Sequence, residues 1–120
     1  MATHPMNPVD AAWYHLDGPA NPAVVNALVT TEKPLAFKKV RKLLEQRLLR
    51  FDRFRQRVAE PVLGLGTPHW EDVEDLDIDA HVHHLAVPQP GDDAALRELV
   101  AAVASTPLPH DRPLWQAYAL

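Results

Sequence analysis

Residues 113–120 have the sequence PLWQAYAL, and this stretch decides how the rest of the chain is interpreted. It opens with Pro113, whose backbone has no N–H group, and continues with Leu114 and Trp115. A proline at the start of an apolar run is typical of a β-strand, and we expect Trp115 to bury a large apolar surface. Because the run is still apolar at Leu120, we expect the strand and the natural protein to continue past this residue.

Two helices are predicted ahead of this strand. The clearer one begins after Asp92, its N-cap, and Pro107 and Pro109 prevent its continuation. Its apolar face recurs at helical spacing and consists of Leu96, Leu99, Val100 and Val103. The other helix is predicted over residues 35–51, where basic residues lie off an apolar stripe. That stripe consists of Phe37, Val40, Leu43, Leu44, Leu48 and Phe51.

Extended segments are predicted in the first part of the chain. Residues 24–31 (VVNALVTT) are apolar and β-branched and lie between prolines, which is typical of a strand. Residues 54–60 and 69–73 are predicted as two further strands joined by a turn, with Trp70 as a buried anchor. Residues 75–87 carry apolar side chains in alternation, which predicts a half-buried extended segment. A short amphipathic turn is predicted after Pro8, formed by Val9, Ala12, Trp13 and Leu16.

This mixture of strands and helices predicts an α/β (α+β) fold, and 120 residues suffice for one small domain covering residues 1–120. Apolar residues make up 47% of the chain, but many of them are alanines, so the expected core is thin. There is no cysteine, which excludes disulfides, thiolate catalysis and cysteine metal sites. No apolar run approaches the roughly 18 residues needed to cross a bilayer, and we expect a cytoplasmic protein.

Charge is distributed unevenly along the chain. Most of the 12 Lys and Arg residues fall within residues 38–57, whereas residues 58–96 contain acidic side chains and no Lys or Arg. The basic half could face an anionic partner, or it could lie against the chain's own acidic segment, and we favour the second interpretation. Aromatic residues are too sparse around the basic segment for a nucleic-acid stacking surface. A peripheral contact with a membrane or lipid droplet fits a basic amphipathic helix better.

Histidines are the first candidates for chemistry. On a strand, His81 and His83 would share a face, and with His84 nearby they raise the possibility of a metal site. Zinc usually takes three or four ligands, and no completing ligand has the right spacing, so we favour a structural role for the cluster and expect no metal. The lone serine, Ser105, lies at a helix end without a nucleophile elbow. Acid pairs such as those at 77 and 79 are predicted to be solvated.

Three stretches resemble the bacterial wax ester synthase/diacylglycerol acyltransferase family. The first is Asn7-Pro8-Val9-Asp10, followed by Trp13, Leu16 and Pro22. The second runs from Pro68-His69-Trp70-Glu71-Asp72 through residues 77–88 to Pro90-Gly91 and is similar to the block W-x-D…F-D-L-D-x-H-x-R-H…L-P-x-P-G. The third, Pro107-Leu108 and Asp111-Arg112-Pro113-Leu114-Trp115, is similar to S-x-P-L-D-x-x-x-P-L-W. The blocks occur in family order along essentially the whole chain.

The resemblance implies a chloramphenicol-acetyltransferase-like fold of two lobes with a tunnel between them. It implies transfer of a fatty acyl group from acyl-CoA to a long-chain alcohol or diacylglycerol by an HHxxxDG motif, with acyl-CoA as a substrate and no cofactor. His83 and His84 are followed by LAVPQ, so this pair does not match the motif. The chain is therefore expected to be most of the N-terminal lobe, cut before the motif and inactive alone, with the C-terminal part of the same enzyme as its partner.

By the same resemblance, Pro113, Leu114 and Trp115 are the predicted site residues, either lining the substrate tunnel or holding the structure. Two other functions stay open. The lobe could be a non-catalytic binding or assembly module that pairs with a separate C-terminal chain. It could also be a condensation-domain-like lobe of a peptide synthetase, which shares the fold and the histidine motif.

Overall fold

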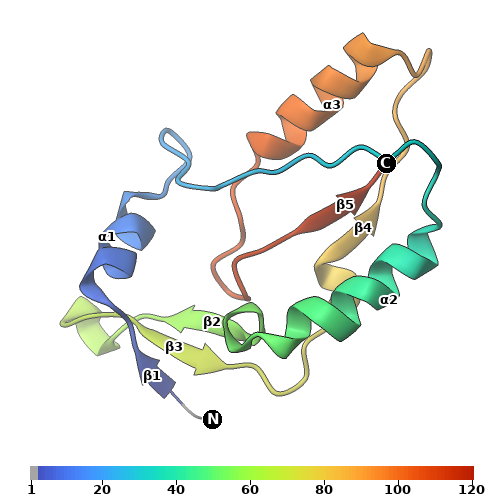
Figure 1. Ribbon diagram of the computed structural model, residues 1–120. Coiled ribbons are helices and arrows are strands. Elements are labelled where there is room, and N and C mark those ends of the chain that lie inside the picture. Colours follow the sequence, from blue (N-terminus) through green and yellow to red (C-terminus); the bar gives the residue numbers. More distant parts are fainter. Residues whose placement is uncertain (1–2) are drawn as a thin grey trace.

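Strands in two small sheets and three helices form the fold in the computed structural model, which describes residues 3–120 (Figure 1). One sheet is antiparallel, with β3 (His69–Asp72) between β1 (Thr3–Pro5) and β2 (Gln56–Ala59). The other is a parallel pair of β4 (Val82–His84) and β5 (Ala117–Ala119). The mixture of helices and strands confirms the predicted α+β class.

The antiparallel hairpin is the part of the sheet that the sequence predicted. β2 and β3 fall within the predicted strands 54–60 and 69–73, and Val58 lies opposite Trp70. Both side chains are buried, which confirms Trp70 as an anchor. The turn between the strands contains a short 3₁₀ helix at Val62–Gly64.

Helix α1 (Pro8–Leu16) replaces the predicted amphipathic turn. The side chain of Asn7 accepts a hydrogen bond from the backbone N–H of Val9 at 2.7 Å, and the proline occupies the first helical turn, where it is tolerated. Of this helix only Ala11 is buried, whereas Trp13 is 61% exposed. The apolar side chains that the sequence singled out on this segment therefore face away from the described core.

Helix α2 (Phe37–Arg47) lies within the predicted span 35–51 and confirms it. The chain tightens into two 3₁₀ turns, Leu48–Arg50 and Asp52–Arg55, before it enters β2. Most of the predicted stripe is half-buried, but Leu43 and Phe51 are exposed.

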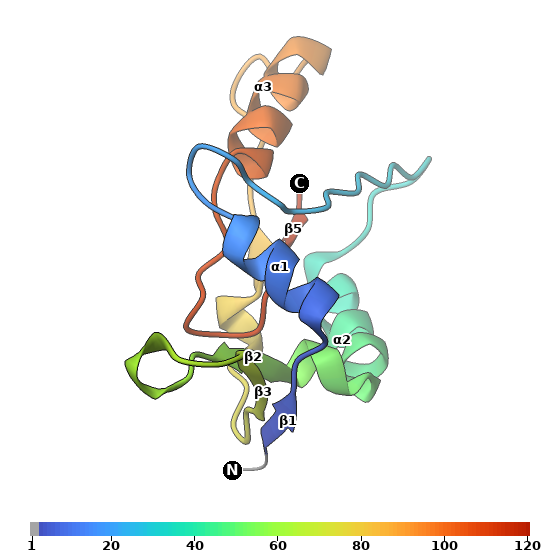
Figure 2. The ribbon, with the colours of Figure 1, turned by 90° about the vertical axis from the view of Figure 1, so that its left-hand side faces the viewer.

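Helix α3 (Asp93–Ala104) confirms the predicted helix and its cap, since the Asp92 carboxylate accepts from the backbone N–H of Ala95 at 2.9 Å. Its predicted apolar face is half-buried, and no residue of the helix is fully buried. In Figures 1 and 2 the helix projects from the body of the molecule.

Three expectations about extended segments are wrong. Residues 24–31 form no strand, and no strand within residues 3–120 pairs with them. The segment 75–87 is interrupted by a 3₁₀ turn at Ile78–Ala80, which Asp77 caps by accepting from the N–H of Asp79 at 3.0 Å. The last strand begins at Ala117 rather than at Pro113.

Two clusters of buried side chains hold these elements together. The first consists of Met6, Ala11, Val58 and Trp70, with Tyr14 and Leu114 packed against it. The second consists of Ile78, Val82 and Trp115, surrounded by partly buried residues mainly from α2 and the 3₁₀ turns. The radius of gyration is 16.4 Å, against about 14 Å for a compact domain of this length, so the arrangement is open.

Candidate functional site

Residues 113–115 lie where the two clusters meet. Pro113 is almost completely buried, Leu114 packs against the first cluster, and Trp115 belongs to the second. The chain bends at Leu114, where the Trp115 N–H donates to the Pro113 carbonyl at 2.9 Å, and adjacent residues thereby reach different clusters. All three predicted site residues therefore make packing contacts with the described chain.

The Trp115 ring is held on several sides. Its Nε1–H donates to the carbonyl oxygen of Phe54 at 2.9 Å, and the Phe54 ring meets it edge-on with centroids 6.1 Å apart. The His81 ring stacks on it with centroids 4.5 Å apart and an interplanar angle of 18°. Hydrogen bonding and stacking together fix the orientation of the indole.

His81 is buried, with 1% of its surface exposed. Its Nδ1 lies 2.8 Å from the carbonyl oxygen of Trp115, and because a carbonyl only accepts, Nδ1 carries the proton. Burial lowers the pKa of His81, the nearby charge of Arg112 lowers it further, and the bond to Trp115 partly opposes this. The ring is therefore neutral at pH 7. The His81 carbonyl also accepts from the N–H of Ala117 at 2.8 Å, so His81 holds the end of the chain through two hydrogen bonds.

The three histidines do not converge. His83 stacks on Tyr118 with centroids 5.1 Å apart and hydrogen-bonds through Nε2 to the side chain of Gln116. His84 stacks on Phe37 with centroids 4.8 Å apart. Among residues 3–120, no group of three or more His, Cys, Asp or Glu side chains is placed to hold a metal ion.

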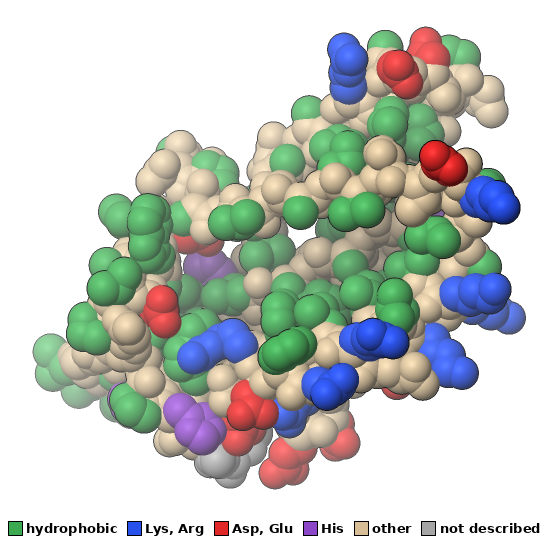
Figure 3. Space-filling model, viewed as in Figure 1, with side chains coloured by type: hydrophobic (Ala, Val, Ile, Leu, Met, Phe, Trp, Pro, Cys, Tyr) green, Lys and Arg blue, Asp and Glu red, His purple; other side chains and the backbone are tan. Residues whose placement is uncertain are grey.

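Part of the basic segment pairs with the chain's own acidic residues. Arg41 on α2 donates to Asp79 at 2.8 Å, which lowers the pKa of that carboxyl, and Arg57 pairs with Glu71 across the hairpin at 2.7 Å. These two pairs agree with the interpretation favoured from the sequence, in which the basic half lies against the chain's own acidic segment. Other basic residues stand free on the face in Figure 3, and within residues 3–120 no ion pair joins Lys38, Lys39 or Lys42 to an acidic group.

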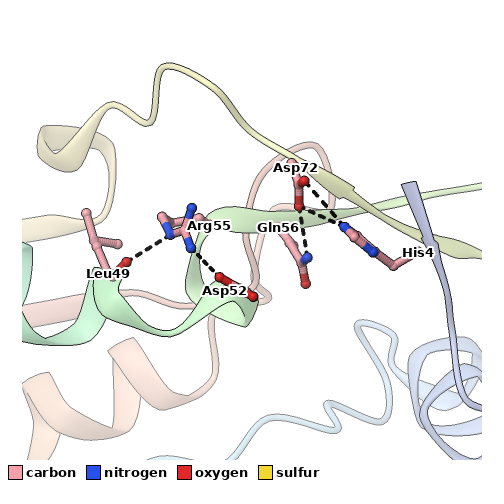
Figure 4. A network of polar contacts seen from close by, with 6 residues as sticks. All are labelled: His4, Leu49, Asp52, Arg55, Gln56 and Asp72. Carbon is pink, nitrogen blue, oxygen red and sulfur yellow. Dashed lines mark hydrogen bonds and ion pairs between the residues drawn. The ribbon is translucent and has the colours of Figure 1, made fainter. Parts of the chain in front are cut away.

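A network of polar contacts links the three strands of the antiparallel sheet (Figure 4). The Asp72 carboxylate accepts from Gln56 Nε2 at 2.9 Å and contacts His4 Nε2 at 3.3 Å, and these two contacts lower its pKa. On the other side, Arg55 pairs with Asp52 and donates to the carbonyl of Leu49 at 2.8 Å. The network joins both outer strands to the central one.

A second polar contact, which the sequence did not predict, ties the end of α1 to the loop before Pro113. His110 Nε2 lies 3.0 Å from the Asp17 carboxylate, which also accepts from the N–H of Ala23 at 2.8 Å. These bonds, the one from Ala23 first, lower the pKa of Asp17. The partners are 93 residues apart, so no local sequence signal could have revealed the pair.

Comparison with known proteins gives a consistent result. Residues 6–120 match the family described as the wax ester synthase/diacylglycerol acyltransferase catalytic domain. A probable diacylglycerol O-acyltransferase of Mycobacterium tuberculosis, tgs3, is 42% identical over 112 residues, which cover 91% of this chain and 41% of that protein. A putative diacylglycerol O-acyltransferase of the same species is 33% identical over 120 residues, covering 96% of this chain and 25% of the relative.

A solved structure has the same fold. The wax ester synthase/diacylglycerol acyltransferase from Marinobacter aquaeolei VT8 superposes with a TM-score of 0.68 at 23% identity. The superposition covers 96% of this chain and 28% of that chain. The chain thus spans less than half the length of each of these similar proteins.

Proposed function

Because this chain belongs to the wax ester synthase/diacylglycerol acyltransferase catalytic domain family, we propose that it is the N-terminal part of an acyl-CoA-dependent O-acyltransferase. The reaction would transfer a fatty acyl group to a long-chain alcohol or diacylglycerol. The observation that carries this proposal is the 42% identity over 112 residues with a probable diacylglycerol O-acyltransferase. The fold class predicted from the sequence, part of a chloramphenicol-acetyltransferase-like fold, agrees with the superposition.

The proposed reaction exchanges a thioester for an oxygen ester. The acceptor hydroxyl loses its proton to a base, its oxygen forms a bond to the acyl carbon, and the bond from that carbon to the CoA sulfur breaks. The proton ends on the CoA thiol. A neutral histidine suits this task because its ordinary pKa lies near the working pH, so it can accept the proton and release it again.

We place that base outside these 120 residues. His83 and His84 form the only adjacent histidine pair in the sequence and lack the Asp-Gly step of HHxxxDG. His81 is neutral and its Nε2 is the basic nitrogen, but the ring is almost completely buried and stacked on Trp115, so an acceptor hydroxyl has no access to it. In this proposal His81 positions the end of the chain and takes no proton from the substrate.

For Pro113, Leu114 and Trp115 we propose a structural role rather than contact with the acyl chain. What supports this is that the described chain itself covers Pro113 and Trp115. A side chain whose surface is already occupied by its own core has little left for a ligand. The triplet would then hold β5 in place for the part of the enzyme that carries the base.

The proposed partners are acyl-CoA, the acceptor lipid and the C-terminal part of the same enzyme. None of the helices in residues 3–120 has both the length and the apolar content needed to cross a membrane. The basic side chains of Lys38, Lys39 and Lys42 on α2 support a peripheral contact of the cytoplasmic enzyme with an anionic membrane or lipid-droplet surface.

The test measures release of free CoA from palmitoyl-CoA with hexadecanol or a diacylglycerol as acceptor. The intact protein is expected to release CoA and form the ester, and the 120-residue chain alone is expected to give only the rate without enzyme. Absence of ester from the intact protein with both acceptors would overturn the proposed activity. Turnover by the 120-residue chain alone would overturn the placement of the base.

A further inference from the structure

The segment of residues 24–31 has the sequence of a strand but lacks a partner. In the part of the chain that the structure describes, none of its backbone N–H or C=O groups bonds to another backbone group. Its apolar side chains are also uncovered: Val25 is 96% exposed, Val29 84% and Leu28 58%. A row of free backbone groups beside exposed β-branched side chains is the signature of an unpaired edge strand.

Apolar residues occupy both even and odd positions of this segment. Val25 and Val29 would lie on one face of a strand, and Val24 and Leu28 on the other. A strand that is apolar on both faces belongs inside a sheet covered on both sides. The segment is therefore suited to a sheet interior and not to an exposed edge.

The views show space beside the segment. In Figure 1 it crosses in front of the end of β5, whereas Figure 2, turned by 90°, shows its later part running away from that strand to the right. The space-filling view shows an open gap between the segment and the body below it (Figure 3). The described chain leaves this side of the segment uncovered.

The amount of exposed surface indicates what kind of partner is missing. The chain exposes 8922 Å², whereas a compact protein of 13.4 kDa exposes about 6,500 Å². The surplus of about 2,400 Å² is several times the roughly 800 Å² that one partner contributes to a standard protein interface. A surplus of this size fits a fold divided through its core better than a pair of transiently associating molecules.

We propose that residues 24–31 pair, through backbone hydrogen bonds, with a β-strand from the part of the family's polypeptide that lies outside these 120 residues. The length of the relatives supports this occupant, because the chain spans 41% of the tgs3 protein and 28% of the solved Marinobacter chain. The proposal goes beyond acyl transfer and does not depend on it. It concerns how the two parts of the protein recognise each other.

The test co-expresses the tagged 120-residue chain with the untagged remainder of the tgs3 protein, the part outside the 112 matched residues. The wild-type chain is expected to capture the remainder in a one-to-one complex. In that complex the amides of residues 24–31 should exchange with deuterium at least about 100-fold more slowly than in the chain alone, as expected for amides in a stable ladder.

Two substitutions at Ala27 serve as the test variant and its control. Ala27→Pro removes an N–H group and should abolish capture, while the melting temperature of the chain alone stays unchanged because Ala27 is exposed and makes no backbone bond there. Ala27→Thr keeps the N–H and should capture normally.

Three results would each overturn the proposal. The wild type could fail to capture the remainder, Ala27→Pro could capture it equally well, or the amides in the complex could stay unprotected. A dimer of the chain alone with these amides protected would overturn it as well. None of these readouts uses CoA release, so failure here is distinguishable from failure of the proposed activity.

Discussion

His81 shows how one side chain can carry a structural and an electrostatic role together. It packs on Trp115, holds the carbonyl of that residue through Nδ1, and accepts the N–H of Ala117 through its own carbonyl. All of these contacts suit the neutral ring, because protonation would place a charge in a buried site. The residue therefore links the stability of the chain end to pH.

The expected pH dependence follows from the lowered pKa of His81. In the unfolded chain the ring takes up a proton as pH falls through about 6.5, while in the folded chain it resists protonation until a lower pH. The contribution to stability is present in full above the unfolded pKa and is lost as pH falls toward the folded pKa. Lowering the pH from 7.5 to 5.5 should therefore reduce the melting temperature of the wild-type chain.

His81→Gln provides the comparison for this prediction. Glutamine cannot titrate, and its side-chain amide can still donate to the Trp115 carbonyl. The variant should be less stable at pH 7.5, because it loses the ring stacking, but its melting temperature should change less between pH 7.5 and 5.5. The other histidines are common to both proteins and cancel in this comparison. An equal change in both proteins would show that His81 does not cause the pH dependence.

At the scale of the element, α3 depends on its N-cap more than on burial. No residue of α3 is fully buried, whereas Asp92 satisfies the N–H of Ala95 at its first turn. Replacing an N-cap aspartate by alanine typically costs about 1 kcal/mol. Asp92→Ala should make the amides of α3 exchange roughly fivefold faster, a change of about 1 kcal/mol in local opening. Hydrogen exchange read by mass spectrometry measures this directly.

Asp92→Asn is the control for this prediction, because asparagine is an equally good cap. Its exchange rates in α3 should stay close to those of the wild type. If Asp92→Ala leaves the exchange of α3 unchanged, the helix is held by its half-buried face and not by the cap.

The elements that the sequence predicted are those with local signals. Asp92 and Pro107 bound α3, an apolar stripe at helical spacing identifies α2, and alternation with Trp70 identifies the hairpin. The 3₁₀ turn at Ile78–Ala80 was missed because alternating apolar residues also fit a turn capped by its own aspartate. Strand pairing at residues 24–31 depends on a partner that the sequence of the segment does not contain.

The site was predicted unevenly for the same reason. Residues 113–115 and the histidines could be singled out by type and spacing, but their partners could not. His81 meets Trp115 across 34 positions, Trp115 meets the Phe54 carbonyl across 61, and His110 meets Asp17 across 93. Contacts at such separations follow from the tertiary fold and not from local sequence.

At the scale of the whole molecule, residues 3–120 bury some apolar side chains and leave others exposed. Val25 and Val29 are exposed, whereas Val58 and Val82 are 7% and 3% exposed. Replacing valine by threonine exchanges one methyl for a hydroxyl at nearly constant volume, which costs about 1–3 kcal/mol where the site is buried without a partner. The same change at an exposed position costs little.

The double substitution Val25→Thr with Val29→Thr should therefore leave the melting temperature of the 120-residue chain within about 4 °C of the wild type, since each surface change stays within roughly 0.5 kcal/mol. The matched double substitution Val58→Thr with Val82→Thr should lower it by at least about 8 °C or unfold the chain. Circular dichroism during heating measures both. Similar losses for the two pairs would mean that the segment of residues 24–31 is already packed in the isolated chain.

The position of the neighbours Leu114 and Trp115 in two different clusters has a mechanical consequence. Each side chain is embedded in a different cluster, yet one peptide unit separates them. Consecutive Cα atoms stay about 3.8 Å apart across this planar unit, so the two clusters cannot separate here, although rotation about the flanking bonds still lets each cluster tilt. A substitution that resizes one cluster is therefore expected to displace the residue that anchors the other.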